Sequence, residues 1–377
     1  MAAGAGDPAA RAAWGDPPWR VDVEIPRRPP PSRCDVAVVG GGFTGLSAAY
    51  HLARRGCRVA VLEATRIGAG ASGRTGGLAL EGTAHGPLPG VESCLPALAE
   101  IVAEAGIGCD LALGDCWEIA HTPAPPRHGI RWRDGDGWLR VVRAVPGGTV
   151  DPGALVAGLA RAALAAGATI HEHTPARRFD AGPPARLHVD GNAVLADRVV
   201  VALNGYTAEL VALPMPLRAP LTLALCTAPL DDAVLTAIGL SVRAPFYTVD
   251  LPYLWGRWVA GGRLIFGAGL VFPPDGIVGH VDIGGAESAA ILARLEARVR
   301  GLHPALATVT VTHRWGGPIA FLARETPLLG ALPGASSVLI AGAYAGHGVA
   351  LSVRVGQLLA DAIVDDAPLP AWGALTP

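Results

Sequence analysis

A segment near the N-terminus constrains the fold more than any other part of the chain. The run CDVAVV at 34–39 is short, apolar and rich in β-branched residues, which is typical of a strand buried on both faces. It leads into GGGFTG at 40–45 and then into LSAAYHLARR at 46–55, where apolar residues recur at helical spacing. RVAVL at 58–62 is a second strand and ends at Glu63. The predicted order is therefore strand, glycine turn, helix, strand and acidic residue.

The glycine turn at 40–45 has the spacing GxGxxG. In a Rossmann unit such glycines admit a pyrophosphate to the N-terminus of the helix, and an acidic residue about 20 positions later bonds a ribose hydroxyl. Glycine turns of this spacing also serve only to pack a strand against a helix. The sequence that follows decides between these alternatives.

Residues 64–77 form a long run of small residues, ATRIGAGASGRTGG. The run exceeds the two to six residues usual between a strand and the next helix in such units. Small side chains let backbone N–H groups approach a large planar ring and a diphosphate, which suits a flavin better than a detachable nicotinamide. We therefore predict FAD rather than NAD.

Composition excludes several other classes of partner. The chain is 51% apolar and 16% charged, so it can bury a large core, and its net charge of −2 provides no strong field for nucleic acid or an anionic membrane. No uninterrupted apolar run approaches the length of a membrane span, and the N-terminus lacks the pattern of a secretory signal. The six cysteines are scattered without CxxC pairs. We expect a reduced, cytoplasmic protein.

Further elements are expected after residue 150. Asp151 is an N-cap for a helix that ends at Gly167, and the following residues ATIHEHT alternate as a strand. His171 and His173 would share one face of that strand. A metal pair is conceivable, but no third ligand has suitable spacing, so we expect exposed strand histidines and no metal. Residues 199–203 predict a buried parallel strand.

The second half of the chain changes pattern. Residues 221–270 read as strands without intervening helices, which predicts an antiparallel sheet forming the wall of a substrate pocket. A helix is expected over 281–301. A last strand at 338–341 enters a glycine turn at 342–348, and a helix follows over 349–364.

These elements predict a fold of mixed α/β and α+β type. A Rossmann-type FAD-binding domain, discontinuous in sequence, is expected beside an antiparallel-sheet substrate domain. The predicted division is an N-terminal arm at 1–32, an FAD-binding domain at 33–85, 147–215 and 326–377, and a substrate domain at 86–146 and 216–325.

The segment GGGFTGLSAAYHLARRGCRVAVLEATRIGAGASGRTGG closely resembles the opening of the FAD-dependent D-amino-acid-oxidase superfamily, in particular its gamma-glutamylputrescine-oxidase-like branch. Other motifs follow in the order that this branch shows, including DRVVVALNGYTAEL, GRLIFGAGL, HRWGG and AGAYAGHGVALSVRVGQLLA. The resemblance extends over nearly the whole chain. It implies bound FAD, with the backbone of Ala176 at the adenine and the turn at 342–348 at the flavin.

The glycine motifs and the resemblance together imply a set of cofactor-binding residues. These are Gly40, Gly42, Phe43, Thr44, Gly45, Glu63, Ala64, Arg66, Gly70, Ala71, Ser72, Gly73, Arg74, Thr75, Gly76, Gly77, Leu78, Ala176, Ala202, Asn204, Gly342, Gly346, His347, Gly348 and Val349. The last four would surround the end of the flavin that becomes negative on reduction, where helix N–H groups can stabilise charge. For His347 the alternative is that only its backbone matters.

The resemblance also implies the reaction, which is removal of hydride from the carbon next to an amine nitrogen to give an imine, with O2 or another acceptor reoxidising the flavin. Such a site mainly binds and aims the amine or amino acid. Arg257, and after it Arg324, are candidates for holding a substrate carboxylate. Either could instead be a surface charge. The aromatic candidates for the pocket are Tyr253, Trp255, Trp315 and Tyr344.

The chain also departs from the family pattern. Thr75 stands where the branch usually has Asn, and the region from Trp315 to Gly330 lacks the cysteine that binds FAD covalently in sarcosine-oxidase relatives. Noncovalent FAD is therefore predicted. Two alternatives remain open. An NADPH-using flavin hydroxylase should carry a Gly-Asp motif in its C-terminal third, but Gly114-Asp115 comes far too early. The other alternative is a flavin-binding subunit that has no turnover of its own.

Overall fold

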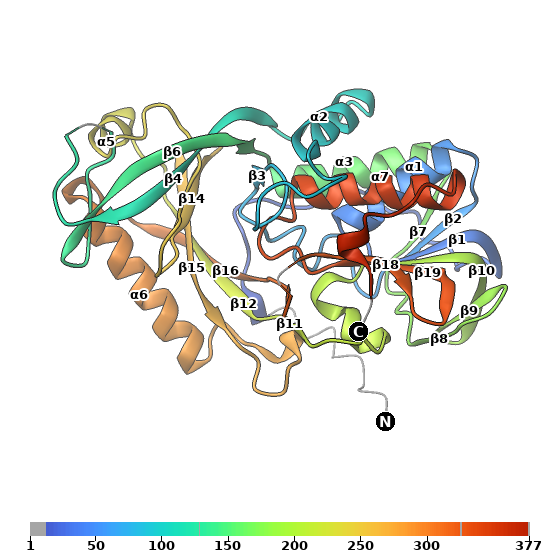
Figure 1. The fold of residues 1–377 in the computed structure, drawn as a ribbon. Helices are drawn as coiled ribbons and strands as arrows, with labels where there is room; N and C mark the ends of the chain where they lie inside the picture. Colours follow the sequence, from blue (N-terminus) through green and yellow to red (C-terminus); the bar gives the residue numbers. More distant parts are fainter. Residues whose placement is uncertain (1–12, 128, 325, 376–377) are drawn as a thin grey trace.

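The computed structural model describes residues 13–127, 129–324 and 326–375. Within these ranges two large β-sheets stand side by side, each with helices packed against it (Figure 1). The first sheet carries the predicted nucleotide-binding unit. The second contains the strands predicted to form a substrate pocket. The fold is thus an α/β cofactor-binding unit beside a second, largely antiparallel sheet, as the sequence predicts.

The first sheet has a parallel core in the order β19, β10, β1, β2 and β7. An antiparallel edge strand, β18, extends it at one side, and the β8–β9 hairpin pairs with β10. Its strands are β1 Arg33–Val39, β2 Val59–Leu62, β7 Thr169–His171, β8 Arg178–Asp180, β9 Ala185–Val189, β10 Asn192–Val201, β18 Leu328–Leu332 and β19 Ala335–Gly342. Segments from near both ends of the chain therefore meet in one sheet.

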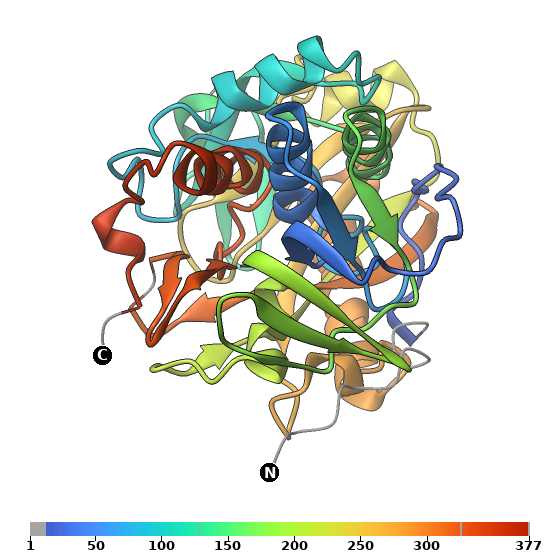
Figure 2. The same ribbon diagram turned by 90° about the vertical axis from the view of Figure 1, so that its right-hand side faces the viewer.

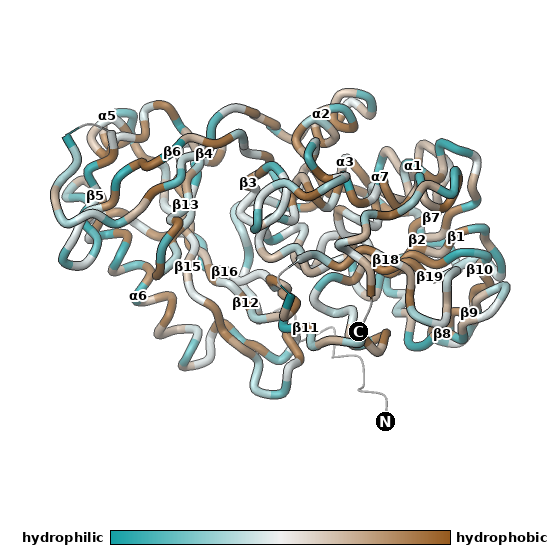
Figure 3. Tube along the Cα trace, in the orientation of Figure 1, coloured by the Kyte–Doolittle hydropathy of each residue, from teal (hydrophilic) through white to brown (hydrophobic). Residues whose placement is uncertain are grey.

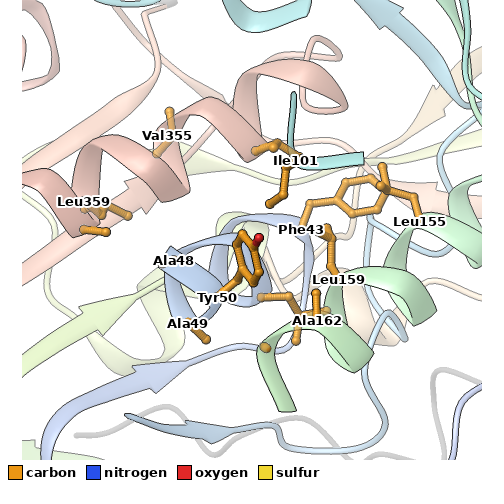
Figure 4. Close-up of a cluster of buried hydrophobic side chains, with 14 of the residues drawn as sticks. Phe43, Ala48, Ala49, Tyr50, Ile101, Leu155, Leu159, Ala162, Val355 and Leu359 are labelled. Atoms are coloured by element: carbon orange, nitrogen blue, oxygen red, sulfur yellow. The ribbon is translucent and has the colours of Figure 1, made fainter. Parts of the chain in front are cut away.

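Three helices lie side by side over one face of this sheet (Figure 2): α1 Phe43–Arg54, α3 Pro152–Ala165 and α7 Ala350–Val364. A further helix, α2 Cys94–Glu104, packs on α7. The core between them is made of aliphatic and aromatic side chains such as Phe43, Tyr50, Leu155, Leu159 and Leu359 (Figure 4). This packing fixes the start of α1 above the carboxyl ends of the parallel strands.

Helices α1 and α7 approach each other closely where Gly356 faces Ser47. A Cβ on Gly356 would lie 2.6 Å from the Ser47 Cβ, so only glycine allows this crossing. The Ser47 hydroxyl donates a hydrogen bond to the Val353 carbonyl over 2.8 Å. The contact joins α1, the helix that follows the first glycine turn, to α7 near the C-terminus.

The second sheet runs in the order β16, β12, β15, β14, β13, β4, β6 and β3, with β5 paired to β6. It is antiparallel except for the parallel pair of β13 and β4. Its strands are β3 Leu78–Leu80, β4 Ala112–Thr122, β5 Trp132–Asp134, β6 Gly137–Thr149, β12 Leu221–Thr227, β13 Phe246–Thr248, β14 Trp255–Val259, β15 Arg263–Val271 and β16 Val311–Pro318. A short two-stranded sheet pairs β11 Leu217–Arg218 with β17 Phe321–Leu322.

Helix α6, Ala286–Leu302, covers the second sheet and contacts β12, β15 and β5. Hydrophilic and hydrophobic positions alternate along it (Figure 3), because Leu292, Leu295, Val299 and Leu302 face the core while most of the other side stays in solvent. The remaining helices, α4 Thr207–Leu210 and α5 Asp232–Ala237, are short.

Several local expectations are wrong in detail. Helix α6 begins five residues later than predicted, because 281–285 holds two glycines and a turn, and α5 interrupts the region expected to hold strands alone. Strand β7 stops at His171. His171 is buried and bonds the Arg28 carbonyl and the Thr169 hydroxyl, while His173 lies in a turn at φ 54°. The two histidines are therefore not an exposed pair on one strand.

Other expectations are confirmed. Asp151 caps α3 by accepting a hydrogen bond from the Ala154 N–H over 2.9 Å, and Gly56 and Gly167 follow α1 and α3 at positive φ. No helix among the described residues is long and apolar enough to cross a membrane. The predicted domain boundaries remain a proposal; β3, just after the long glycine-rich run, pairs with β6 in the second sheet.

Candidate functional site

A cavity of about 1490 Å³ lies where the two sheets meet. Its walls include the glycine turn after β1, the small-residue run after Glu63, the ends of β10 and β19, and residues of β12–β15 and α6. This exceeds the roughly 300–1,000 Å³ of an ordinary small-molecule pocket. The cavity therefore has room for a dinucleotide together with a second molecule.

The first glycine turn forms the floor of this cavity at the N-terminus of α1. Gly40 adopts φ 111°, and a Cβ there would lie 2.6 Å from the Ala202 carbonyl oxygen. A Cβ on Gly42 would lie 2.8 Å from the Ser72 hydroxyl. The same hydroxyl accepts a hydrogen bond from the Phe43 N–H over 3.0 Å. Glycine at these positions thus keeps side chains away from the backbone at the helix N-terminus, as the close approach of a diphosphate requires.

Glu63 stands at the carboxyl end of β2 and lines the cavity. Its carboxylate accepts hydrogen bonds from the N–H groups of Gly41 and Thr65, each over 2.9 Å. These bonds fix the carboxylate beside the glycine turn. The position is the one from which a dinucleotide-binding carboxylate reaches a ribose.

The run from Gly68 to Gly77, here called the flavin loop, closes one side of the cavity. Gly68, Gly70, Ala71, Ser72, Arg74, Thr75 and Gly76 line it. The loop is folded on itself, since the Gly73 N–H donates to the Gly68 carbonyl over 3.1 Å and the Thr75 N–H to Ala71 over 2.9 Å. The small residues therefore form an ordered wall against which a flat ring can lie.

The turn before α7 closes the opposite side. Asn204, at the end of β10, accepts a hydrogen bond from the Ala343 N–H over 2.8 Å. Tyr344 is buried and shares a 2.7 Å hydrogen bond with the Thr44 hydroxyl, while burial raises the pKa of its phenol. Burial also lowers the pKa of His347, whose side chain is therefore neutral at pH 7.

Most of the residues predicted to bind the cofactor line this single cavity. They are Gly40, Gly42, Phe43, Thr44, Glu63, Ala64, Gly70, Ala71, Ser72, Arg74, Thr75, Gly76, Leu78, Ala176, Ala202, Asn204, Gly346, His347 and Gly348. The others lie outside its wall: Gly45, Arg66, Gly73, Gly77, Gly342 and Val349. Gly45 and Gly342 serve close packing instead, since a Cβ would lie 2.0 Å from the Gly40 oxygen or 2.9 Å from the Asn204 Cα.

Neither arginine predicted to hold a substrate carboxylate lines the cavity. Arg257 is buried, and its guanidinium donates to the carbonyls of Gly76, Val150 and Trp258. Arg324 donates to the carbonyls of Pro327, Gly373 and Ala374 and so ties down the C-terminal segment. Both guanidinium groups bind backbone carbonyls away from the cavity, so neither is positioned to hold a substrate carboxylate.

The four aromatic candidates all line the cavity. Trp315 is buried and donates its indole N–H to the Arg74 carbonyl over 3.0 Å. The ring of Trp255 fills the space beside Gly76 and Gly267, where no Cβ could fit. Tyr253 is 59% exposed and stands at the rim. Aromatic walls from both sheets therefore border the space beside the flavin loop.

A hydrogen-bonded glutamate and tyrosine in the wall were not predicted from the sequence. Glu118 on β4 and Tyr247 on β13 are direct neighbours in the sheet, and the tyrosine hydroxyl donates to the carboxylate over 2.7 Å. Hydrogen bonds from Arg143 hold the pKa of Glu118 below its ordinary value, although burial opposes them. The available signal was an acidic residue in an otherwise apolar strand segment, CWEIA.

Two arginines on α6 were not predicted from the sequence either. Ile291, Arg294, Leu295 and Arg298 share one helix face and line the cavity. Asp134 pairs with Arg298, its carboxylate accepting the Nε–H over 2.8 Å. Arg294 is exposed, and among the described residues it has no hydrogen-bond or ion-pair partner. The only available signal was spacing along the helix, since Arg294 comes three residues after Ile291 and Arg298 three residues after Leu295.

The cavity reaches this helix beside the end of β15, since residues 268–270 line it. Strand β14 begins at Trp255, opposite Gly267, so in the described pairings residues 268–271 of β15 pair only with β12. Val249 and Leu251, in the connection between β13 and β14, also line the cavity. Both are substantially exposed. The second part of the cavity is thus largely apolar, with a few charged groups.

Comparisons with known proteins agree with this geometry. The profile of the DAO family, described as FAD dependent oxidoreductase, matches residues 35–362. A probable oxidoreductase OrdL of Rhizobium meliloti is 28% identical, covering 90% of this chain and 86% of the relative. The gamma-glutamylputrescine oxidoreductase of Escherichia coli is 27% identical, covering 89% and 84%.

Among solved structures, glycine oxidase from Geobacillus kaustophilus superimposes with a TM-score of 0.74 at 24% identity, covering 92% of this chain and 99% of that one. That likeness concerns the fold. The family match covers most of the chain, and the glycine turn, the acidic residue and the flavin loop that it implies are assembled around one cavity that fits FAD. The chain belongs to the DAO family of FAD-dependent oxidoreductases.

Proposed function

We propose that this FAD-dependent oxidoreductase oxidises a C–N bond of an amine or amino acid. The substrate carbon loses hydride and its nitrogen loses a proton, and the resulting imine reacts with water to give a carbonyl compound and an amine. FAD, which the glycine turn, Glu63 and the flavin loop would hold, would supply the two-electron acceptor for the hydride, with its N5 turned to the substrate, and O2 or another acceptor would restore it. We expect the FAD to be held without a covalent bond.

One observation carries this proposal: the cavity wall that fits FAD continues without a break into an apolar and aromatic pocket with few polar groups. A site of this kind positions a substrate beside the cofactor and excludes water. Relatives whose names state amine or amino-acid substrates, the gamma-glutamylputrescine oxidoreductase and a glycine oxidase, support the same class of reaction.

Within this pocket we assign binding roles to the charged groups that face it. Glu118, kept ionised by Arg143, and the Tyr247 oxygen would accept hydrogen bonds from a substrate ammonium group before it loses its proton. Arg294 would bind an anionic group if the substrate carries one. Trp255 and Trp315 would border the reacting end.

The first test is anaerobic reduction of the purified holoenzyme by a panel of amines, N-methyl amino acids and amino acids. Bleaching of the flavin absorbance by members of this panel, with no reduction by NADPH alone, is the expected result. Rapid reduction by NADPH would indicate a hydroxylase instead. A flavin that no amine or amino acid bleaches would contradict the proposal.

The panel should contain pairs of amines that differ only in a distal carboxylate, assayed with the wild type and Arg294→Ala. Removing the arginine should lower kcat/KM about tenfold for the carboxylate-bearing member, the size expected for one charged hydrogen bond, and leave the other unchanged. Arg300→Ala is the matched control, because Arg300 lies on the same helix, outside the cavity wall. Equal losses for both members would remove Arg294 from the proposal.

A further inference from the structure

Three carbonyls of the flavin loop accept hydrogen bonds from buried side chains, of which only Trp315 also lines the cavity. The indole N–H of Trp19 donates to the Gly73 carbonyl over 2.8 Å, and that of Trp315 to the Arg74 carbonyl over 3.0 Å. The guanidinium of Arg257 donates to the Gly76 carbonyl. We call these three side chains the rear clamp. Trp19 and Arg257 do not line the cavity, so they contact the loop from behind.

The side chains of the rear clamp also support one another. The rings of Trp19 and Trp315 meet edge to face, with centroids 5.6 Å apart, and the Arg257 guanidinium lies 5.7 Å from the Trp19 ring centroid. All three residues are buried. Arg257 is further fixed by the Val150 carbonyl at 2.9 Å. Displacing any one of them would leave a buried loop carbonyl and the N–H group that bonds it unpaired, and would remove a ring contact from its neighbour.

Trp19 belongs to the N-terminal segment, which is fastened along its length. The Trp14 indole donates to the Val281 carbonyl over 2.8 Å, and Arg161 of α3 donates to the Asp22 carbonyl over 3.0 Å. Arg74 of the flavin loop donates to the Gly15 carbonyl over 2.7 Å. The segment therefore runs from the second sheet, behind the flavin loop, to a helix of the first sheet.

We propose that the rear clamp holds the flavin loop in its binding conformation before FAD arrives, and that Trp19 is a positioning residue for the cofactor. A loop this rich in glycine loses much conformational entropy when it is ordered. If FAD had to order it, that cost would weaken binding. If the loop is already ordered, a larger fraction of the apoprotein is in the conformation that binds FAD. The apparent Kd for FAD is then closer to the Kd of that binding conformation.

The test compares tryptophan-to-phenylalanine variants, which keep an aromatic ring but remove the indole N–H. FAD is titrated into each apoprotein, and Kd is measured together with the visible circular dichroism of the bound flavin. Trp19→Phe should raise the Kd for FAD about tenfold, as expected when one buried hydrogen bond to the loop is lost, and should alter the flavin spectrum. Trp315→Phe, which frees the Arg74 carbonyl, should act in the same direction and serves if Trp19→Phe does not fold.

A matched control separates this effect from general destabilisation. Trp132→Phe removes a buried indole bond of the same length, to the Ile238 carbonyl at the end of α5, far from the flavin loop. It should lower the Tm of the apoprotein but leave the Kd for FAD unchanged. The proposal is overturned if Trp19→Phe and Trp315→Phe bind FAD as Trp132→Phe does, or if Trp132→Phe weakens FAD binding as much as Trp19→Phe.

Discussion

At the residue scale, the site depends on two separate properties of glycine. Gly40 needs both a positive φ and the absence of a Cβ, which would lie 2.6 Å from the Ala202 oxygen, whereas Gly56 has a positive φ but open space around it. We expect Gly40→Ala to abolish FAD binding, because the turn must move. Gly56→Ala should cost about 1–2 kcal/mol of unfolding free energy through backbone strain alone and keep FAD bound. The FAD content of both variants is measured after gel filtration, and their free energy of unfolding is measured in urea. FAD retained by Gly40→Ala would contradict the steric argument.

Sequence patterns predict such glycines well, because the spacing of a turn is local and its chemistry lies in the backbone. The direction in which a long side chain points cannot be predicted in this way. Arg257 and Arg324 look like free cations in the sequence, yet both donate to carbonyls that come from distant segments. Nothing near either residue in the chain shows where those carbonyls lie. For the same reason Glu118 and Tyr247, which meet only through strand pairing, could not be found.

At the scale of elements, the connection between β13 and β14 is held over the cavity by a charged network. His121 bonds both Asp250 and Asp134, over 2.9 and 2.7 Å, and Arg298 bonds Asp134 and the Tyr253 carbonyl. Arg298→Met should loosen this connection, because it removes the bond to Tyr253 and leaves Asp134 with one partner fewer.

Hydrogen exchange checks this directly. The amides of Val249 and Leu254, which are bonded to Ile119 and to the Thr248 hydroxyl, should exchange about tenfold faster in Arg298→Met. Arg300→Met is the control, since Arg300 pairs with Glu296 away from this connection. FAD content should stay unchanged in both variants. Unchanged exchange in Arg298→Met would show that the network does not hold the connection.

Elements with local signals were predicted closely, and those that depend on distant contacts were not. The strand, turn and helix of the first unit and the Asp151 cap lie where periodicity and capping place them. The N-terminal arm gave no periodic signal, although Trp14 and Trp19 are buried in the structure. Trp19 packs on Trp315 of β16 and bonds the flavin loop, and Trp14 packs among residues of β12 and β15, all of which are remote in sequence.

At the scale of the whole molecule, the excess of glycine has a structural role that composition alone could not assign. The turns at 40–45, 68–77 and 342–348 come from separate parts of the chain, and residues of each line one cavity. The strands expected before these turns predicted that separate parts of the chain form one FAD-binding unit, which contains the first sheet. Side chains of β14 and β16, in the second sheet, donate hydrogen bonds to the flavin loop. This contact could not be predicted, because strand order is set by packing rather than by local pattern.

Because residues of both sheets line the cavity, FAD bound there would link two cores. Aromatic residues such as Trp132, Phe246 and Phe266 form a core of the second sheet separate from the one around α1. We expect the apoprotein to unfold in two calorimetric transitions, with the FAD-binding part melting first. Saturating FAD binds only the folded site and stabilises it by about 2.7 kcal/mol at a hundredfold excess over Kd, so it should raise the first transition until the two merge. A single transition in the apoprotein, which FAD merely shifts to a higher Tm, would show that the two cores already unfold together without the cofactor.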